Sequence, residues 1–222
     1  MNKELMKPAP VFILFMSTLL LPELAFSTDL DLEKLAKAGK LEVVNRTMDQ
    51  TKADSPGVVF LNAAQGDGLA WIAGEEFSEG TIELETKGKN QPGLSFIGVA
   101  FHGQNNRIYD VIYLRPFNFQ SSERGNHSIQ YISLPDHDWL DLRNLHPGIY
   151  ESSITPAPDG ESWVKLKLVI RGGTVSAYVN GANQPALIVS LLNHRSGSKL
   201  GLWVGNGSDG WFRNLSITPA IN

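Results

Sequence analysis

Cysteine is absent from the 222-residue sequence. Its absence excludes disulfide bonds, thiol nucleophiles, cysteine-ligated zinc and anchoring through a lipidated cysteine. Stability must therefore come from the hydrophobic core alone. Lysine and arginine form no block along the chain, and the formal net charge is -4. For this reason we do not expect a nucleic acid as a partner.

The sequence also lacks the motifs of several common catalytic sites. It contains no Gly-x-Ser-x-Gly elbow, no phosphate-binding glycine loop and no dinucleotide fingerprint. Serine hydrolase, kinase and nicotinamide-dependent activities therefore find no support. No two histidines have the spacing of metal ligands, so we predict no zinc site. The histidines are His102, His127, His137, His146 and His194.

The first residues have the pattern of a signal peptide, residues 1–27. Lys3 and Lys7 form a positive segment, residues 11–21 form a short apolar run, and Ser27 ends a stretch that fits a cleavage site. The apolar run is too short for a bilayer, which takes about 20 apolar residues, and no later stretch approaches that length. We therefore expect cleavage near Ser27 and an exported protein, periplasmic or extracellular, without a membrane span.

The remaining chain is predicted to form one all-β domain. Residues 28–40 form either an arm or one short helix that Gly39 would end. Residues 41–220 then alternate short runs of Val, Ile, Tyr, Phe and Trp with Gly, Pro, Asn and Asp, as in an antiparallel sandwich or barrel. The predicted strands are residues 41–45, 57–62, 68–73, 80–86, 94–102, 108–115, 127–133, 163–171, 174–180, 186–190, 199–205 and 211–218.

Turn residues and alternation define the best-specified part of this pattern. Gly172 and Gly173 separate two alternating strands as a hairpin turn with positive φ requires, and Asn180-Gly181 is a similar signal one strand later. Strand 163–171 alternates apolar and mostly polar residues, so one of its faces is buried. Residues 134–161 contain four prolines and no alternation, and we predict a long loop that folds against the rim of a sheet.

Five segments in this order carry a resemblance to a known superfamily. They are GTIELE at 80–85, WVKLK at 163–167, VSAYVNG at 175–181, GLWVGN at 201–206 and FRNL at 212–215. The chain resembles the concanavalin A-like lectins and glucanases over residues 41–218. Within that superfamily it looks most like laminin G-like and family 16-like, or 3-keto-disaccharide hydrolase-like, domains of secreted bacterial proteins.

This resemblance implies a two-sheet antiparallel jelly-roll sandwich with one short N-terminal helix. The concave sheet of such a sandwich often binds sugars. Members of the superfamily range from hydrolases to binding modules, so the fold alone does not choose between these functions.

The strand at 108–115 and the residues after it carry the candidate binding surface. Period-two alternation places Tyr109, Tyr113 and Arg115 on one face, opposite Ile112 and Leu114. If Ile112 and Leu114 face the core, the aromatic and arginine stripe faces outward; the alternative is that the stripe itself faces the core. Aromatic rings can stack on the C–H faces of sugars, and arginine donates to hydroxyls or carboxylates. The candidate contacts are Tyr109, Tyr113, Arg115, Phe117, Gln130 and Trp139.

Four carboxylates are candidates for acid and base catalysis. A retaining glycosidase needs two carboxyl groups about 5 to 5.5 Å apart. Glu83 and Glu85 lie two residues apart on one predicted strand, but the family 16 motif Glu-x-Asp-x-x-Glu is absent, which disfavours that type of hydrolysis. The alternative is that they form the solvated face of the strand. Asp110 and Glu151 are the other candidates.

The loop at 205–210 offers Asn206 and Asp209 as weak candidate ligands for calcium, although it reads equally as a tight hairpin connection. No other cofactor is expected. The function predicted from these features is that of an exported, monomeric β-sandwich domain that binds a glycan on its concave face. The first alternative is a glycoside hydrolase, and the second is an adhesive module that binds a protein through a sheet edge or the long loop.

Overall fold

The structure is a computed structural model that describes residues 26–53, 55–193 and 195–221. The predicted signal peptide lies outside the described residues, except for its last two positions. Among the described residues, no helix is both long enough and apolar enough to cross a bilayer.

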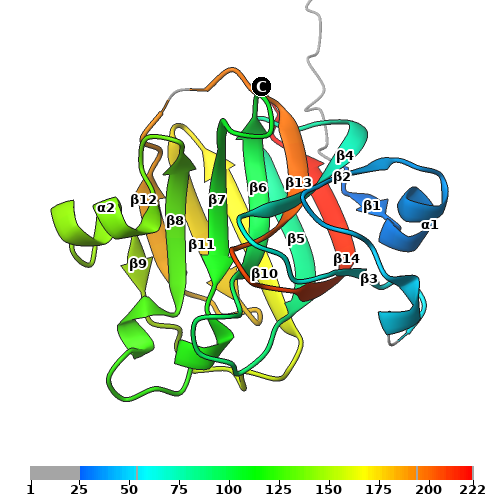
Figure 1. The fold of residues 1–222 in the computed structure, drawn as a ribbon. Helices are drawn as coiled ribbons and strands as arrows, with labels where there is room; N and C mark the ends of the chain where they lie inside the picture. The colour runs from blue at the N-terminus through cyan, green and yellow to red at the C-terminus, as the bar shows by residue number, and fades with distance from the viewer. Residues whose placement is uncertain (1–25, 54, 194, 222) are drawn as a thin grey trace, which may run out of the picture.

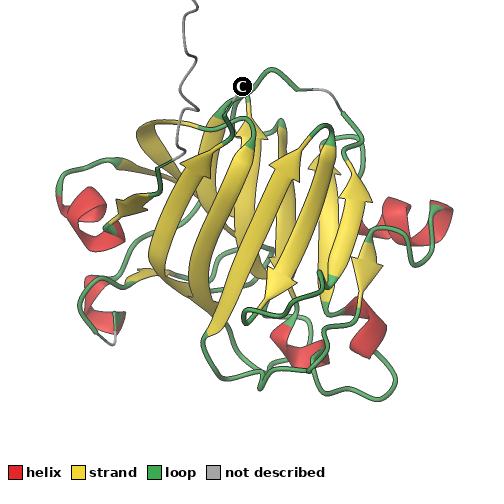
Figure 2. Ribbon diagram, turned by 180° about the vertical axis from the view of Figure 1, so that it is seen from behind, coloured by secondary structure: helices red, strands yellow, loops and turns green. Residues whose placement is uncertain are grey.

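Two antiparallel sheets lie face to face (Figures 1 and 2), which confirms the predicted all-β sandwich. The first sheet, nearer the viewer in Figure 2, contains in spatial order β1 (Thr28–Leu30), β14 (Gly210–Pro219), β5 (Gly80–Lys87), β10 (Val164–Arg171), β11 (Thr174–Val179) and β12 (Leu187–Ser190), and β3 (Val59–Leu61) also pairs with β14. The second sheet, nearer the viewer in Figure 1, contains β2 (Leu41–Val44), β4 (Gly68–Glu76), β13 (Lys199–Val204), β6 (Ile97–Gly103), β7 (Tyr109–Leu114), β8 (Ile129–Leu134) and β9 (Glu151–Ser152).

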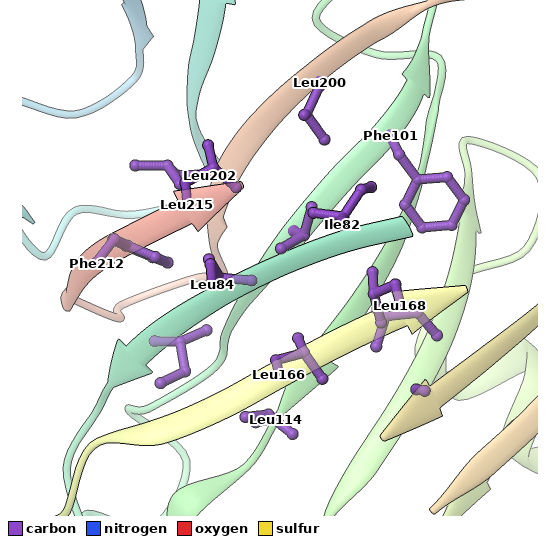
Figure 3. Close-up of a cluster of buried hydrophobic side chains, with 14 of the residues drawn as sticks. Ile82, Leu84, Phe101, Leu114, Leu166, Leu168, Leu200, Leu202, Phe212 and Leu215 are labelled. Carbon is purple, nitrogen blue, oxygen red and sulfur yellow. The ribbon is translucent and has the colours of Figure 1, made fainter. Parts of the chain in front are cut away.

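The main hydrophobic core lies between these sheets (Figure 3). In β10 the apolar residues at every second position are buried, while Lys165 between them is exposed, as the alternation predicts. Ile82 and Leu84 of β5 and Leu114 of β7 are fully buried in the same cluster. One face of each sheet therefore packs in the core, and the other face points outward.

The hairpin between β10 and β11 has the predicted turn. Arg171 pairs with Thr174, and the two residues between them, Gly172 and Gly173, have φ of 56° and 75°. Positive φ strains residues with a Cβ, so glycine suits both positions. Asn180 and Gly181, with φ of 52° and 72°, form the turn that leaves β11.

Residues 28–40 pack on the sandwich. Thr28–Leu30 is strand β1, paired with β14, and the helix α1 (Leu32–Lys37) begins after Asp31, whose side chain accepts a hydrogen bond from the backbone N–H of Lys34. Leu32 is buried in the main core. Of the two expected arrangements, the structure has the short helix, tied to the sheet edge.

The predicted loop at 134–161 contains regular structure, and that prediction was wrong for part of its length. A helix α2 (Trp139–Leu145) begins where the Asp138 carboxylate accepts hydrogen bonds from the N–H groups of Leu140 and Asp141. Leu142 is its buried residue, and β9 follows the helix. Figure 1 shows α2 beyond the edge formed by β8 and β9. The helix has a single buried apolar residue, which gives no periodic signal in the sequence.

Three 3₁₀ turns complete the described structure. They are η1 (Gln50–Lys52), η2 (Pro116–Asn118) and η3 (Gly125–His127). The last two connect β7 to β8, at the end of the second sheet where the candidate site lies.

Candidate functional site

A cavity of about 580 Å³ lies over one end of the second sheet, on the face that points away from the main core. We call it the end cavity. The register aligns one row of residues across four strands: Gly68, Val204, Ile97 and Leu114. The residues next to this row in sequence all line the cavity: Asp67, Gly205, Phe96 and Arg115. The other lining residues are Pro92, Gly93, Tyr113, Phe117, Asn118, Arg124, Ile132, Leu134, Asp138, Trp139, Arg143, Trp203 and Asn206.

Aromatic side chains form much of the cavity lining. Trp203, Gly98 and Tyr113 lie side by side on β13, β6 and β7, and the rings of Trp203 and Tyr113 are 5.1 Å apart. A Cβ at Gly98 would lie 2.8 Å from the Cβ of Tyr113, so the missing side chain of glycine permits this contact. Phe96 meets Phe117 edge to face, with centroids 5.6 Å apart.

A buried polar network supports these rings from below. Arg115, which is only 4% exposed, donates hydrogen bonds to the Tyr113 hydroxyl at 2.6 Å and to the side-chain oxygen of Gln130. Gln130 in turn donates to the backbone carbonyl of Trp139 at 3.1 Å. The network therefore joins the floor of the cavity on β7 and β8 to the start of α2.

Glu151 compensates the charge of the arginines beneath the cavity. Arg143 donates to its two oxygens from Nε at 2.9 Å and from Nη2 at 2.6 Å. Arg115 Nη1 lies 3.5 Å and His127 Nδ1 2.8 Å from Oε2. Burial alone would raise the pKa of Glu151, but the hydrogen bonds of Arg143 and His127 outweigh burial and hold this pKa below its ordinary value. Glu151 is thus a charged, fixed carboxylate.

Asp67 is a cavity carboxylate that was not among the residues predicted from the sequence. Burial raises its pKa, and the charge of Arg46 and a hydrogen bond from the backbone of Asn206 only partly oppose this effect. Arg46 is itself held by the carbonyls of Gly66 and Gly205, at 2.6 and 2.9 Å. The sequence signal for Asp67 was its place between two glycines directly before a buried strand.

The predicted binding residues divide into two groups. Ile112 and Leu114 face the main core, so the stripe of β7 points away from it, as in the first of the two alternatives. Four of the six candidates line the end cavity: Tyr113, Arg115, Phe117 and Trp139. Gln130 is fully buried beneath it, and Tyr109 is 3% exposed and packs against Trp71 at 5.7 Å. Phe117 belongs to η2, since β7 ends at Leu114.

The four candidate catalytic carboxylates do not share one groove. Glu83 and Glu85 lie on the outer face of the first sheet, where they pair with Lys165 at 2.6 Å and Arg213 at 2.7 Å. Asp110 is fully buried, and its carboxylate accepts a hydrogen bond from the Tyr131 hydroxyl at 3.0 Å. Only Glu151 adjoins the cavity, where the arginines hold it. The proposed pairing of Glu83 with Glu85 therefore has no access to the end cavity.

Each of the two candidate calcium ligands already has a partner at one side-chain oxygen. Asn206 Oδ1 accepts a hydrogen bond from the backbone N–H of Gly66 at 2.7 Å, and Asp209 pairs with Lys89 Nζ at 2.5 Å. Within the described ranges, no group of three or more His, Asp or Glu side chains could hold a metal ion. The arrangement at 205–210 does not fit a calcium site.

No protein-family model matches the chain, and no curated protein sequence matches it. Solved structures share its fold. The carbohydrate-binding module CBM66 from Bacillus subtilis is 13% identical, with 81% of this chain and 96% of that chain covered and a TM-score of 0.57. The exoplasmic/lumenal domain of VIP36, in a form bound to Ca²⁺ and Man3GlcNAc, is 13% identical over 83% of this chain and 86% of that chain, with a TM-score of 0.57.

A third neighbour is a protein of unknown function with a galectin-like fold from Bacillus subtilis. It is 13% identical, with 89% of this chain and 96% of that chain covered and a TM-score of 0.55. Identities this low show the fold alone. The chain has the two-sheet antiparallel jelly-roll fold that the resemblance in its sequence implies.

Proposed function

We propose that the protein is an exported domain that binds a carbohydrate in the end cavity. The observation that carries the proposal is the combination, in one cavity, of aromatic rings, with the exposed Trp139 among them, and fixed polar groups. Trp139 is 44% exposed at the cavity, although most tryptophans are largely buried. Two of the neighbours with this fold are named for binding carbohydrate or are bound to one, which supports the same class of ligand.

The geometry favours sugar rings over purely apolar ligands. Trp139 and Phe117 line the cavity with rings that can stack on the C–H groups of a sugar ring, and the Asp67 carboxyl group can accept hydrogen bonds from its hydroxyls. The network through Arg115 holds Tyr113 and the start of α2 before any ligand arrives. A prearranged site loses less conformational freedom on binding, and this smaller loss of entropy increases the affinity.

The decisive experiment measures binding of polysaccharides and oligosaccharides to the purified protein and to Trp139→Ala. We expect this substitution to weaken binding about tenfold or more, because a truncated tryptophan at a binding surface commonly costs more than about 1 kcal/mol. Trp163→Ala is the matched control, since Trp163 lies directly before β10 of the first sheet, with its ring against Arg213. Equal affinities for all three proteins, or no glycan bound by any of them, would overturn the proposal.

A glycoside hydrolase is the second candidate, and Asp67 is the observation that favours it. A cavity carboxyl with a raised pKa has the property that a general acid needs, and Asp138 supplies a second carboxylate in the same lining. Mass spectrometry of glycans incubated with the protein tests this function. New products that disappear in Asp67→Asn would identify a hydrolase, whereas unchanged glycans together with binding would identify a binding domain.

We also propose that the protein is exported as a monomer after cleavage near Ser27. The charged and apolar pattern of its first residues supports export. The intact mass of the protein recovered from the cell envelope or the medium tests cleavage, and its mass in solution by light scattering tests the monomer. A mass that retains residues 1–27 would contradict the first expectation, and a doubled mass in solution the second.

A further inference from the structure

The end cavity concentrates positive charge in a protein whose formal net charge is -4. Three arginines line it: Arg115 after β7, Arg124 before η3 and Arg143 in α2. Arg124 and Arg143 both lie close enough to Arg115 to affect its pKa. Burial is the main cause that lowers the pKa of Arg115, and the charges of Arg143 and Arg124 lower it further. All three remain protonated at physiological pH.

The protein uses only part of the hydrogen-bonding capacity of this cluster. Arg115 donates its hydrogen bonds to acceptors within the protein, namely Tyr113, Gln130 and the carbonyl of His127. Arg143 donates to Glu151 from Nε and Nη2, which leaves Nη1 without an acceptor among the described residues. Arg124 is exposed, and its guanidinium has no ion pair or hydrogen bond with any residue in the described part of the chain.

The acidic side chains of the cavity do not neutralise these free donors. Glu151 is one carboxylate between Arg115 and Arg143. Asp138 accepts hydrogen bonds at its Oδ1 from two N–H groups at the start of α2, and among the described residues it forms no ion pair with Arg124 or Arg143. Asp67 precedes β4, so β13 and β6 lie between it and Arg115 at the end of β7. The cavity therefore has an arginine side and, across the sheet, an acidic side.

We infer that the carbohydrate held in the end cavity is an acidic one, and that Arg124 and Arg143 bind the carboxylate of a uronic acid residue. This inference rests on the proposed function. A guanidinium group matches a carboxylate in shape and charge, and such charge-assisted hydrogen bonds are about twice as strong as neutral ones. Asp67 repels a carboxylate and accepts hydroxyls, so the glycan enters with its acidic group toward α2.

The experiment compares uronic acid oligosaccharides with their own neutral forms. Oligomers of galacturonate, glucuronate, mannuronate and guluronate are each tested beside the product of reducing their carboxylates to alcohols, which keeps the ring and removes the charge. Calorimetry should show at least one acidic oligomer that binds about tenfold more tightly than its reduced form. This preference should shrink as salt is raised, because salt screens the attraction between exposed charges.

Arg124→Gln should weaken binding of the acidic oligomer about tenfold and weaken binding of its reduced form clearly less, because the reduced form offers no charge to the guanidinium. Arg107→Gln is the matched control. It removes the same charge from another exposed arginine, in the loop between β6 and β7 at the opposite end of the sheet. Melting temperatures of both variants equal to that of the unaltered protein would show that neither effect comes from unfolding.

Each outcome bears on a different claim. Equal affinity for an acidic oligomer and its reduced form would overturn the acidic ligand and leave the proposed function standing. Equal losses in Arg124→Gln and Arg107→Gln would overturn the assignment to Arg124, because the attraction would then come from the overall charge. Binding of neither form, nor of any other glycan, would overturn the proposed function and this inference with it.

Discussion

The outer faces of the two sheets carry the same kinds of ion pair in opposite environments. On the first sheet, the side chains of Glu83 and Lys165 are 27% and 49% exposed. On the second sheet, those of Glu151 and Arg115 are 3% and 4% exposed. The first pair remains in contact with water, whereas the second lies under the floor of the end cavity.

This difference in exposure determines how much each ion pair contributes to the structure. An exposed pair contributes between about 0 and 1 kcal/mol. Removing both charges of a buried pair from water costs free energy. The attraction within the pair offsets this cost only when hydrogen bonds satisfy both partners. Glu151 meets this condition through the hydrogen bonds that Arg143 donates to it. Arg115 meets it through Tyr113, Gln130 and the carbonyl of His127. We therefore regard it as a positioning residue that holds the arginines of the cavity in place.

The largest expected effect comes from removing the buried carboxylate. Glu151→Ala leaves Arg115 buried without its ionic partner, and we expect a loss of about 3 to 5 kcal/mol in the free energy of unfolding. Urea denaturation of the variant and the unaltered protein measures this loss. In Glu151→Leu with Arg115→Met, both charges are gone, so this double variant should recover part of it. A loss below about 1 kcal/mol in Glu151→Ala would contradict the buried-pair interpretation.

Acid should test the same pair without a change of side chain. The pKa of Glu151 is lowered in the folded protein from an ordinary value of 4.5, so the unfolded chain binds its proton first as the pH falls. Its contribution to stability is complete above about pH 4.5 and disappears as the pH drops through the folded pKa. Unfolding free energies between pH 7 and pH 3 should fall less steeply in Glu151→Gln than in the unaltered protein.

Glu83→Gln is the control for this titration. The pKa of Glu83 is also lowered, chiefly by its hydrogen bond from Lys165, but solvent screens that pair. Its acid dependence should therefore remain close to that of the unaltered protein. The buried-pair interpretation fails if Glu83→Gln flattens the pH dependence as much as Glu151→Gln does.

A smaller effect of opposite sign is expected at Asp67. Burial raises its pKa above the ordinary value of 3.8, so it favours folding below that pH and opposes folding once it is charged. Asp67→Asn removes this charge and should raise the free energy of unfolding by about 0.5 to 1 kcal/mol at pH 7 while it weakens glycan binding. Urea denaturation and calorimetry measure the two effects. A variant that loses stability at pH 7 would contradict the assigned cost of the buried charge.

Local patterns explain which parts of the fold could be predicted. Each of the twelve predicted strands overlaps an observed one, because period-two alternation and turn residues act within a few positions. The short strands β1 and β9 escaped prediction because their pairing depends on distant partners, β14 and β8. Helix α2 escaped it because the helix buries only Leu142.

In the candidate site, too, contacts set by local sequence could be predicted and contacts between distant segments could not. Tyr113 and Arg115 could be predicted as neighbours because they share one face of one strand. Asp67 comes from a turn far away in the sequence, and only the pairing of β4 with β13 and of β13 with β6 brings it to the cavity. The burial of Arg115 was not predictable either, because it depends on Gln130, His127 and Glu151 gathering around it.

The smallest expected effect lies on the first sheet. Glu83 pairs with Lys165 at 2.6 Å, yet Glu83→Gln should change the free energy of unfolding by less than about 1 kcal/mol, and by less still in high salt, because water and ions already screen both charges. Urea denaturation at low and high salt measures this change. A loss as large as that of Glu151→Ala would contradict the distinction between the two faces, since it would mean that the exposed ion pair stabilises the fold as much as the buried one.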